Sequence, residues 1–248
     1  MKTYITALLS VLLFSCVTGG GVVDKSKLAE GYYNKGLAFL QEQNYERASV
    51  EFHRSIQTDN SFKQAYYSLG LISSFQDKLD DAERFFKKAI DLDENYSEAY
   101  NALGIVYSRR ERWDDALKCF KKALENKLYE SPHIAYVNMG NVYMTRKEYA
   151  KATEAYRDAK RFVNQDVIIY QLGMALFEAG RIGEAIGEYR EGIAMAPQNA
   201  SLHYGLALAF LKQGEKKSAI QEFKSAAALA PSSDIGVKAN NYLKALKQ

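Results

Sequence analysis

The side chains that most often carry chemistry are few in this chain of 248 residues, and they lie far apart. Its three histidines, His53, His133 and His203, have no second histidine, cysteine or carboxylate at the spacing of a metal site. The glycines form no phosphate-binding loop, and no serine, cysteine or threonine stands at a strained nucleophile turn. The sequence therefore predicts a protein that is not an enzyme and that takes no metal, cofactor or small-molecule substrate.

Cys16 is the one residue placed for a modification, because it ends an apolar run. Residues 4–14 are too short to span a bilayer as a helix, but they suit the core of a secretory signal peptide. The end of this run, Leu13-Phe14-Ser15-Cys16, resembles the bacterial lipobox, from which it departs at Phe14. The resemblance implies cleavage after residue 15 and palmitate-type acyl chains on Cys16. An ordinary signal peptide with an incidental cysteine is the alternative.

The residues after Cys16 indicate where such a lipoprotein would be held. Val17 follows the cysteine, and the absence of aspartate there resembles lipoproteins sent to the outer membrane of a Gram-negative cell, facing the periplasm. Residues 16–28, with three consecutive glycines, are expected to form a flexible tether. The only other cysteine, Cys119, then has no partner within the chain and is expected to be a free, packed thiol.

The overall charge excludes one class of partner. The chain has 33 basic and 30 acidic side chains, a formal net charge of +3, and loss of residues 1–15 removes one lysine and no acid. Pairs such as Lys87-Lys88 have acids nearby in the sequence. A nucleic-acid-binding protein would show a basic stripe, so no nucleic acid is expected as a partner.

Most of the chain consists of six copies of one pattern. Small residues recur at spacings of 34, 34, 36, 33 and 34, at Gly36, Gly70, Gly104, Gly140, Gly173 and Ala207. An alanine lies twelve residues after each of them, at Ala48, Ala82, Ala116, Ala152, Ala185 and Ala219. An aromatic residue follows four positions later in every copy. Two antiparallel helices approach closely only where side chains are tiny, so the small residues are predicted to lie where paired helices cross.

Helical hairpins of this kind cannot bury their apolar faces alone, and neighbouring hairpins must stack. The pattern resembles the tetratricopeptide repeat. The resemblance implies an all-α, right-handed superhelical solenoid of six repeats over residues 29–233. Residues 234–248 are predicted to form a C-terminal capping helix, with Val237, Tyr242, Leu243 and Leu246 on its inner face. The predicted repeats cover residues 29–62, 63–96, 97–130, 133–165, 166–199 and 200–233.

The same resemblance implies a partner-binding groove, lined by the second, fifth, ninth and twelfth residues of each first helix. Most of these residues are apolar, which favours an amphipathic helix or an extended apolar peptide as the guest. Two alternatives stay open: the side chains pack between repeats, or the C-terminal helix lies in the groove. The predicted groove residues are Tyr33, Leu37, Leu40, Tyr67, Leu71, Ile134, Val137, Tyr170, Met174, Phe177, Tyr204 and Leu208.

Six repeats behind a lipobox resemble the pilotin lipoproteins of type IV pili, which help the pilus secretin reach the outer membrane and form its multimeric ring. The local resemblance is the longer link between repeats three and four, where Leu128-Tyr129-Glu130-Ser131-Pro132 precedes Ala135-Tyr136-Val137-Asn138-Met139-Gly140. The family implies a secretin segment in the groove of repeats one and two. The alternative is an envelope adaptor for a cell-wall hydrolase or for another secretion complex.

Overall fold

The computed structural model describes residues 24–246. The predicted signal peptide, Cys16 and the tether up to residue 23 lie outside the described residues. Helix α1 already begins at Lys25, with Asp24 as its N-cap, so the predicted tether is four residues too long at its C-terminal end. The Asp24 carboxylate accepts hydrogen bonds from the backbone N–H groups of Ser26 and Lys27, which fixes the start of the helix there.

Residues 24–246 form thirteen α-helices and contain no strand, which confirms the predicted all-α solenoid. Twelve helices pair into six hairpins, and the thirteenth follows the last hairpin. The helices are α1 (Lys25–Gln41), α2 (Tyr45–Thr58), α3 (Lys63–Phe75), α4 (Leu79–Leu92), α5 (Ser97–Arg109), α6 (Trp113–Glu125), α7 (Pro132–Thr145), α8 (Tyr149–Phe162), α9 (Asp166–Glu178), α10 (Ile182–Met195), α11 (Ala200–Gln213), α12 (Lys216–Leu229) and α13 (Asp234–Leu246).

Each hairpin is closed by the same short turn. One residue of every turn has a positive φ, which lets the chain leave the first helix and enter the second within three residues. Glycine occupies this position in the last two hairpins, and larger residues adopt it in the first four. These residues are Gln43, Asp77, Glu111, Lys147, Gly180 and Gly214.

The recurring glycines lie under the core aromatic rings of their own hairpins. All five are buried, and a Cβ added to any of them would lie 2.5 Å from a ring carbon of the aromatic residue sixteen positions later. The six recurring alanines of the second helices are fully buried. The two helices of a hairpin are therefore close together because the glycine backbone packs directly on an aromatic ring, in addition to the small residues expected where the helices cross.

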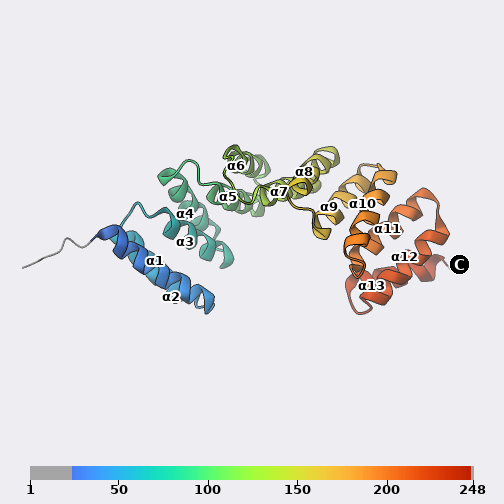
Figure 1. Cartoon of the computed structure of the whole chain (residues 1–248), viewed down its shortest axis with the longest axis horizontal. Coiled ribbons are helices and arrows are strands. Elements are labelled where there is room, and N and C mark those ends of the chain that lie inside the picture. The colour runs from blue at the N-terminus through green and yellow to red at the C-terminus, as the bar shows by residue number, and fades with distance from the viewer. Residues whose placement is uncertain (1–23, 247–248) are drawn as a thin grey trace, which may run out of the picture.

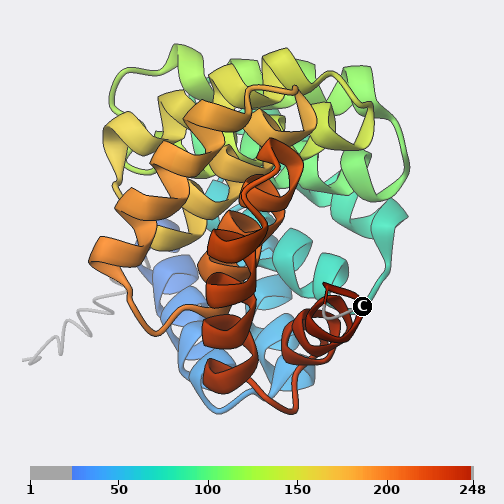
Figure 2. The same cartoon turned by 90° about the vertical axis from the view of Figure 1, so that its right-hand side faces the viewer.

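The hairpins stack into an arch. Figure 1 shows them following one another from α1 at one end to α13 at the other, with α5 to α8 at the crown. Figure 2 looks along the long axis of the arch. The middle hairpins lie at the top of this view, and the first and last hairpins lie at the bottom. Each helix packs on its neighbours in the chain, and the first helices α3, α5 and α7 also touch in succession. One core cluster runs from α4 to α13, and a smaller one joins α2 to α3.

The longer link between repeats three and four belongs partly to the core. Tyr129 is buried and joins the main core cluster, whereas Leu128 beside it is 87% exposed. Pro132 then occupies the first turn of α7, where its missing N–H costs no helical hydrogen bond.

Helix α13 packs on α12 and α11, and so extends the stack. The Tyr242 ring stacks on the Phe223 ring with centroids 4.8 Å apart and an interplanar angle of 4°. Val237 was predicted to face inward, but it is 51% exposed because Gly236 and Ala239 form the buried side of the helix. The Tyr242 ring also lies edge-on to the ring of the predicted groove residue Tyr204, with centroids 6.3 Å apart, so this helix packs against the groove residue of the last repeat.

Candidate functional site

The predicted groove residues lie at the surface of the arch or just beneath it. None of the twelve is buried: nine are half-buried, and Leu71, Ile134 and Met174 are exposed. At the corresponding ninth position of α5, Ile105 is also exposed. This face therefore offers apolar side chains to a partner along the length of the solenoid.

The tyrosines at the fifth position of four repeats also contribute to the packing within their hairpins. Each lies over the core aromatic ring of its own hairpin, so only part of its side chain reaches the groove. Burial also raises the pKa of Tyr67 and of Tyr170 above the ordinary value. The centroid separations are 5.5 Å for Tyr33–Phe52, 5.8 Å for Tyr67–Phe86, 6.2 Å for Tyr170–Tyr189 and 5.7 Å for Tyr204–Phe223.

A pocket of about 250 Å³ lies between α5 and α7. Its walls combine buried core side chains, among them Phe120 and Val142, with polar and exposed residues at the mouth. The guanidinium of Arg109 belongs to the lining, but it donates to the carbonyl of Ser74 at 2.7 Å and to the Asp77 carboxylate at 2.7 Å. The full lining is Ile105, Ser108, Arg109, Trp113, Phe120, Asn138, Asn141, Val142 and Thr145.

Side-chain amides form a line across the first helices beside this pocket. Asn138 Nδ2 donates to Asn101 Oδ1 at 3.0 Å, which links α7 to α5. Asn141 Oδ1 accepts from the Tyr156 hydroxyl at 2.7 Å and from Gln171 Nε2 at 3.3 Å, which links α7 to α9. The side-chain oxygen of Gln171, Oε1, is buried and has no hydrogen-bond partner among residues 24–246.

The apolar groove pattern did not single out Asn138 and Gln171. Both stand two residues before the crossing glycine of their repeats, at Gly140 and Gly173. An amide recurring at that one position in consecutive repeats is the signal that could have found them.

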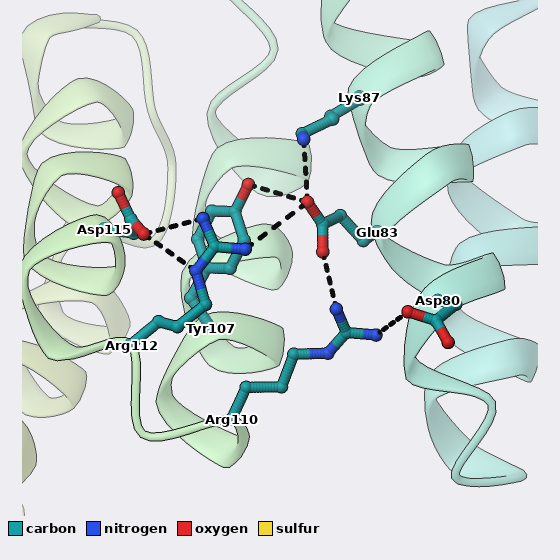
Figure 3. A network of polar contacts seen from close by, with 7 residues as sticks. All are labelled: Asp80, Glu83, Lys87, Tyr107, Arg110, Arg112 and Asp115. Carbon is teal, nitrogen blue, oxygen red and sulfur yellow. Dashed lines mark hydrogen bonds and ion pairs between the residues drawn. The ribbon is translucent and has the colours of Figure 1, made fainter.

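An ionic network joins the second hairpin to the third. Figure 3 shows the Glu83 carboxylate of α4 accepting from Lys87 Nζ at 2.7 Å, from the Tyr107 hydroxyl at 3.1 Å and from Arg110 Nη1 at 2.9 Å. Burial alone would raise the pKa of Glu83. The hydrogen bonds and the positive charges of Lys87 and Arg110 outweigh it, and the pKa lies below 4.5.

A larger hollow lies away from the amide line. It measures about 690 Å³, and all of its lining residues except Tyr66 belong to α4. Its lining includes acids and bases, among them Glu83, Lys87 and Asp91. The smaller pocket between α5 and α7 is lined by Ile105, Ser108 and Asn141 of the groove face, and it is therefore the better candidate for binding a partner side chain in the groove.

His203 and the second cysteine are held by their surroundings. His203 has one ring nitrogen 2.6 Å from Glu222 Oε2 and the other 3.0 Å from the carbonyl of Pro197. Burial raises the pKa of the free Cys119 thiol to about 11, so the thiol stays protonated near neutral pH. Residues 24–246 contain no cluster of three or more potential metal ligands. No helix among these residues is both long and apolar enough to cross a membrane.

Three family models described as tetratricopeptide repeat match the chain. One matches residues 29–62, a second matches 64–128, and a third matches 101–167 and again 170–234, which is more than half of the chain. Two human proteins share 33% identity with short stretches. They are an intraflagellar transport protein 88 homolog, over 34% of this chain and 11% of that protein, and protein O-mannosyl-transferase TMTC1, over 30% and 8%. The chain thus spans about a tenth of each.

Similar solved structures cover nearly all of the described fold. A structure from a functional characterisation of Pseudomonas aeruginosa PilF has a TM-score of 0.74 at 20% identity, over 88% of this chain and 99% of that one. PilW, described as a widely conserved type IV pilus biogenesis factor, also gives 0.74, at 18% identity over 86% and 98%. YrrB, a repeat protein with an unusual peptide-binding site, gives 0.64 at 22% identity over 77% and 97%. These similarities establish the fold.

Proposed function

The chain belongs to the tetratricopeptide-repeat family, and on that premise we propose that it is a lipid-anchored scaffold promoting type IV pilus biogenesis. Repeats of this family generally bind other proteins and are generally not enzymes. In this proposal the scaffold is held at the periplasmic face of the outer membrane by acyl chains on Cys16. It binds the pilus secretin, and so aids the localisation and multimerisation of that pore.

The observation that carries the proposal is a match of the whole solenoid. The fold follows PilF and PilW over nearly their full lengths, with six hairpins and a final helix in one continuous stack. The lipobox-like sequence ending at Cys16 supports the proposed anchor. The long link at Leu128 to Pro132, which resembles the pilotins in sequence, is ordered around the buried Tyr129.

The groove of repeats one and two is the proposed secretin-binding surface. Tyr33 and Tyr67 are half-buried there, and Leu37 and Leu71 follow them by four residues, on the same face of α1 and of α3. Leu71 is 41% exposed, so an apolar segment of the partner would remove it from water. The nearby membrane anchor would raise the effective concentration of this surface around a secretin arriving at the outer membrane.

The test is co-purification of the secretin with the full-length protein from detergent extracts, with Leu71→Asp as the groove variant. Leu71 is preferred to Tyr67 because the tyrosine ring packs on Phe86 and its loss would disturb the fold. A buried charge in the interface should reduce secretin recovery at least about tenfold. Val50→Asp is the control, because Val50 is exposed on the second helix α2, and it should recover secretin normally.

A deletion strain provides the second measurement. Secretin multimers should be fewer, and the remaining monomer should be found away from the outer membrane. Normal multimers in that strain, together with no secretin recovered by the wild-type protein, would contradict the proposal and favour another envelope complex.

A further inference from the structure

The two ends of the arch differ in charge, and the C-terminal end is basic. Residues 212–246 contain six lysines and three acidic residues, whereas residues 24–211 contain 25 basic and 27 acidic side chains. We propose that the lysines of α12 and α13, with Lys212 near the end of α11, form a second membrane contact that binds the headgroup phosphates of anionic phospholipids. The inference rests on the proposed function only in that a lipid anchor at Cys16 brings the arch to the bilayer.

Five of these six lysines are free to bind an anion. All six are exposed, and only Lys238 forms an ion pair within residues 24–246, with Asp234 on the same helix. A second acid of this part, Glu222, is occupied by the His203 ring. The positive charge of the remaining lysines is therefore left uncompensated by nearby acids. These lysines are Lys212, Lys216, Lys217, Lys224 and Lys244.

The turn of the last hairpin brings three of these lysines together. Lys212 lies in the last turn of α11, and Lys216 and Lys217 open α12. The chain reverses between them at Gly214, whose φ is 88°. Three ammonium groups thus lie at one edge of the hairpin.

Helix α13 adds a fourth lysine to this edge, because it runs back along α12. Its first turn begins against the end of α12, where the backbone of Gly236 lies on the carbonyl of Ala230. Further along, the Tyr242 ring stacks on Phe223 in the middle of α12. The C-terminal part of α13, with Lys244, therefore lies beside the first half of α12.

Helix α13 also exposes apolar surface near its lysines. Val237 is 51% exposed and Tyr242 is 36% exposed. A membrane interface accepts both kinds of side chain, because lysines bind the phosphate groups while tyrosine and apolar side chains lie at the level of the headgroups and the first acyl carbons. An acidic protein surface would match the charges alone. The combination therefore favours a bilayer.

Both ends of the arch lie on the same side of its crown. In Figure 1 the first hairpin and the helices α12 and α13 lie below α5 to α8, and the end-on view of Figure 2 shows the same relation. The proposed anchor is attached to the first hairpin through a tether of roughly 29 Å at most. A bilayer that meets the anchored end on the side away from the crown therefore also meets the basic end.

The lysine contact by itself is weak and reversible. Each lysine near an anionic surface strengthens binding about fivefold, and salt screens the attraction beyond about 8 Å at physiological ionic strength. The lysines thus orient an anchored protein, and they do not hold a free one. A protein without acyl chains should still leave the membrane fraction.

The first test is sedimentation of the full-length Cys16→Ala protein with vesicles at about 50 mM salt, where screening is weak and no acyl chain contributes. The protein should sediment with vesicles of phosphatidylethanolamine and phosphatidylglycerol, but not with vesicles of phosphatidylcholine. Lys216→Gln, Lys217→Gln and Lys244→Gln together should weaken this binding about 100-fold.

A matched control removes three charges from the crown instead. Lys118, Lys121 and Lys127 are exposed and form no ion pair within residues 24–246, so their replacement by glutamine should leave vesicle binding unchanged. Both triple variants change only exposed side chains and should keep the helical circular dichroism. No binding to the phosphatidylglycerol vesicles, or equal binding by the two triple variants, would overturn the proposal and assign the lysines to an acidic protein.

A fluorescent label tests the orientation of the anchored protein. Because Cys119 is buried and Cys16 is acylated in this proposal, a thiol-reactive label attaches only to a new cysteine. In vesicles that carry a quencher on the lipid headgroup, a label at Ala245→Cys of α13 should be quenched. A label at Ala150→Cys of α8, at the crown, should not be. Equal quenching at both positions would contradict the contact of both ends.

These tests are independent of the secretin. No secretin is present in either experiment, so failure of the lysine contact leaves the secretin proposal standing. Failure of secretin recovery would likewise leave the vesicle results intact.

Discussion

At the scale of single residues, glycine has two distinct tasks in this chain. Six glycines, the five recurring ones and Gly205, face aromatic rings at contact distance, and there even a methyl group would collide. Two others, Gly180 and Gly214, have positive φ angles in the hairpin turns and have open space around them. The first task is a matter of volume and the second of backbone conformation, so substitutions at the two kinds of site fail for different reasons.

A matched pair of substitutions separates the backbone contribution. Gly180→Ala should lower the free energy of unfolding by about 1 kcal/mol, because a Cβ at a φ of 75° is strained even though nothing lies within 4 Å. Gly187→Ala also meets nothing within 4 Å, but Gly187 lies in the interior of α10, and the substitution should raise stability by about 0.5–1 kcal/mol. Thermal melts of the two variants should shift in opposite directions. Equal shifts would mean that the turn does not require glycine.

At the scale of helices, hairpins are joined by charged side chains as well as by the apolar core. Arg110 and Arg112, at the turn between α5 and α6, reach back to Glu83 on α4, and Arg146 reaches from the next hairpin to Asp114. Single exposed ion pairs contribute little, but Glu83 is only 15% exposed and accepts three hydrogen bonds. The stability of the contact between the second and third hairpins should therefore depend on pH.

The sign of that dependence follows from the lowered pKa of Glu83. A carboxyl group with a depressed pKa in the folded state contributes stability above its ordinary pKa of 4.5, and this contribution is lost as the pH falls through the folded value. Glu83→Gln should lower stability by roughly 1–3 kcal/mol at pH 7 and show a smaller loss in acid than the wild type. Glu94→Gln makes the same charge change at an exposed residue and should follow the wild type. Melting curves from pH 7 to pH 3 measure the difference.

At the scale of the whole molecule, the proposed anchor confines the arch to the membrane surface. Helix α1 begins at Lys25, so eight residues separate it from Cys16. Fully extended, they span at most roughly 29 Å. The first hairpin, which carries the proposed secretin-binding residues Tyr33 and Leu37, would therefore work close to the bilayer.

Cys16→Ala tests this placement. Without acyl chains the protein should move from the membrane pellet to the soluble periplasmic fraction, because two or more chains are needed for stable anchoring. Cys119→Ala makes the same change at the buried cysteine and should leave the protein in the pellet. A Cys16→Ala protein that stays in the membrane fraction would contradict lipid anchoring at this residue.

The sequence alone determined the all-α repeat architecture. The 34-residue spacing of Gly36, Gly70 and Gly104, with alanine and aromatic residues at fixed distances, leaves few ways to pack the helices other than as stacked hairpins. The start of α1 was misplaced because the Asp24 cap precedes the repeat pattern. Val237 was placed on the wrong face because α13 packs through its small residues, Gly236 and Ala239.

Only the tertiary structure decided which groove residues are free to bind. Tyr67 and Leu71 look equivalent as apolar groove positions in the sequence. In the structure the Tyr67 ring packs on Phe86 of the core, whereas Leu71 is exposed. The structure alone also shows that the side-chain amides of Asn141 and Gln171, from neighbouring hairpins, are hydrogen-bonded to each other. A repeat pattern fixes contacts within each copy, because those lie at short sequence separations. The pocket and the amide line form between copies, where the exact stacking of neighbouring helices sets the distances.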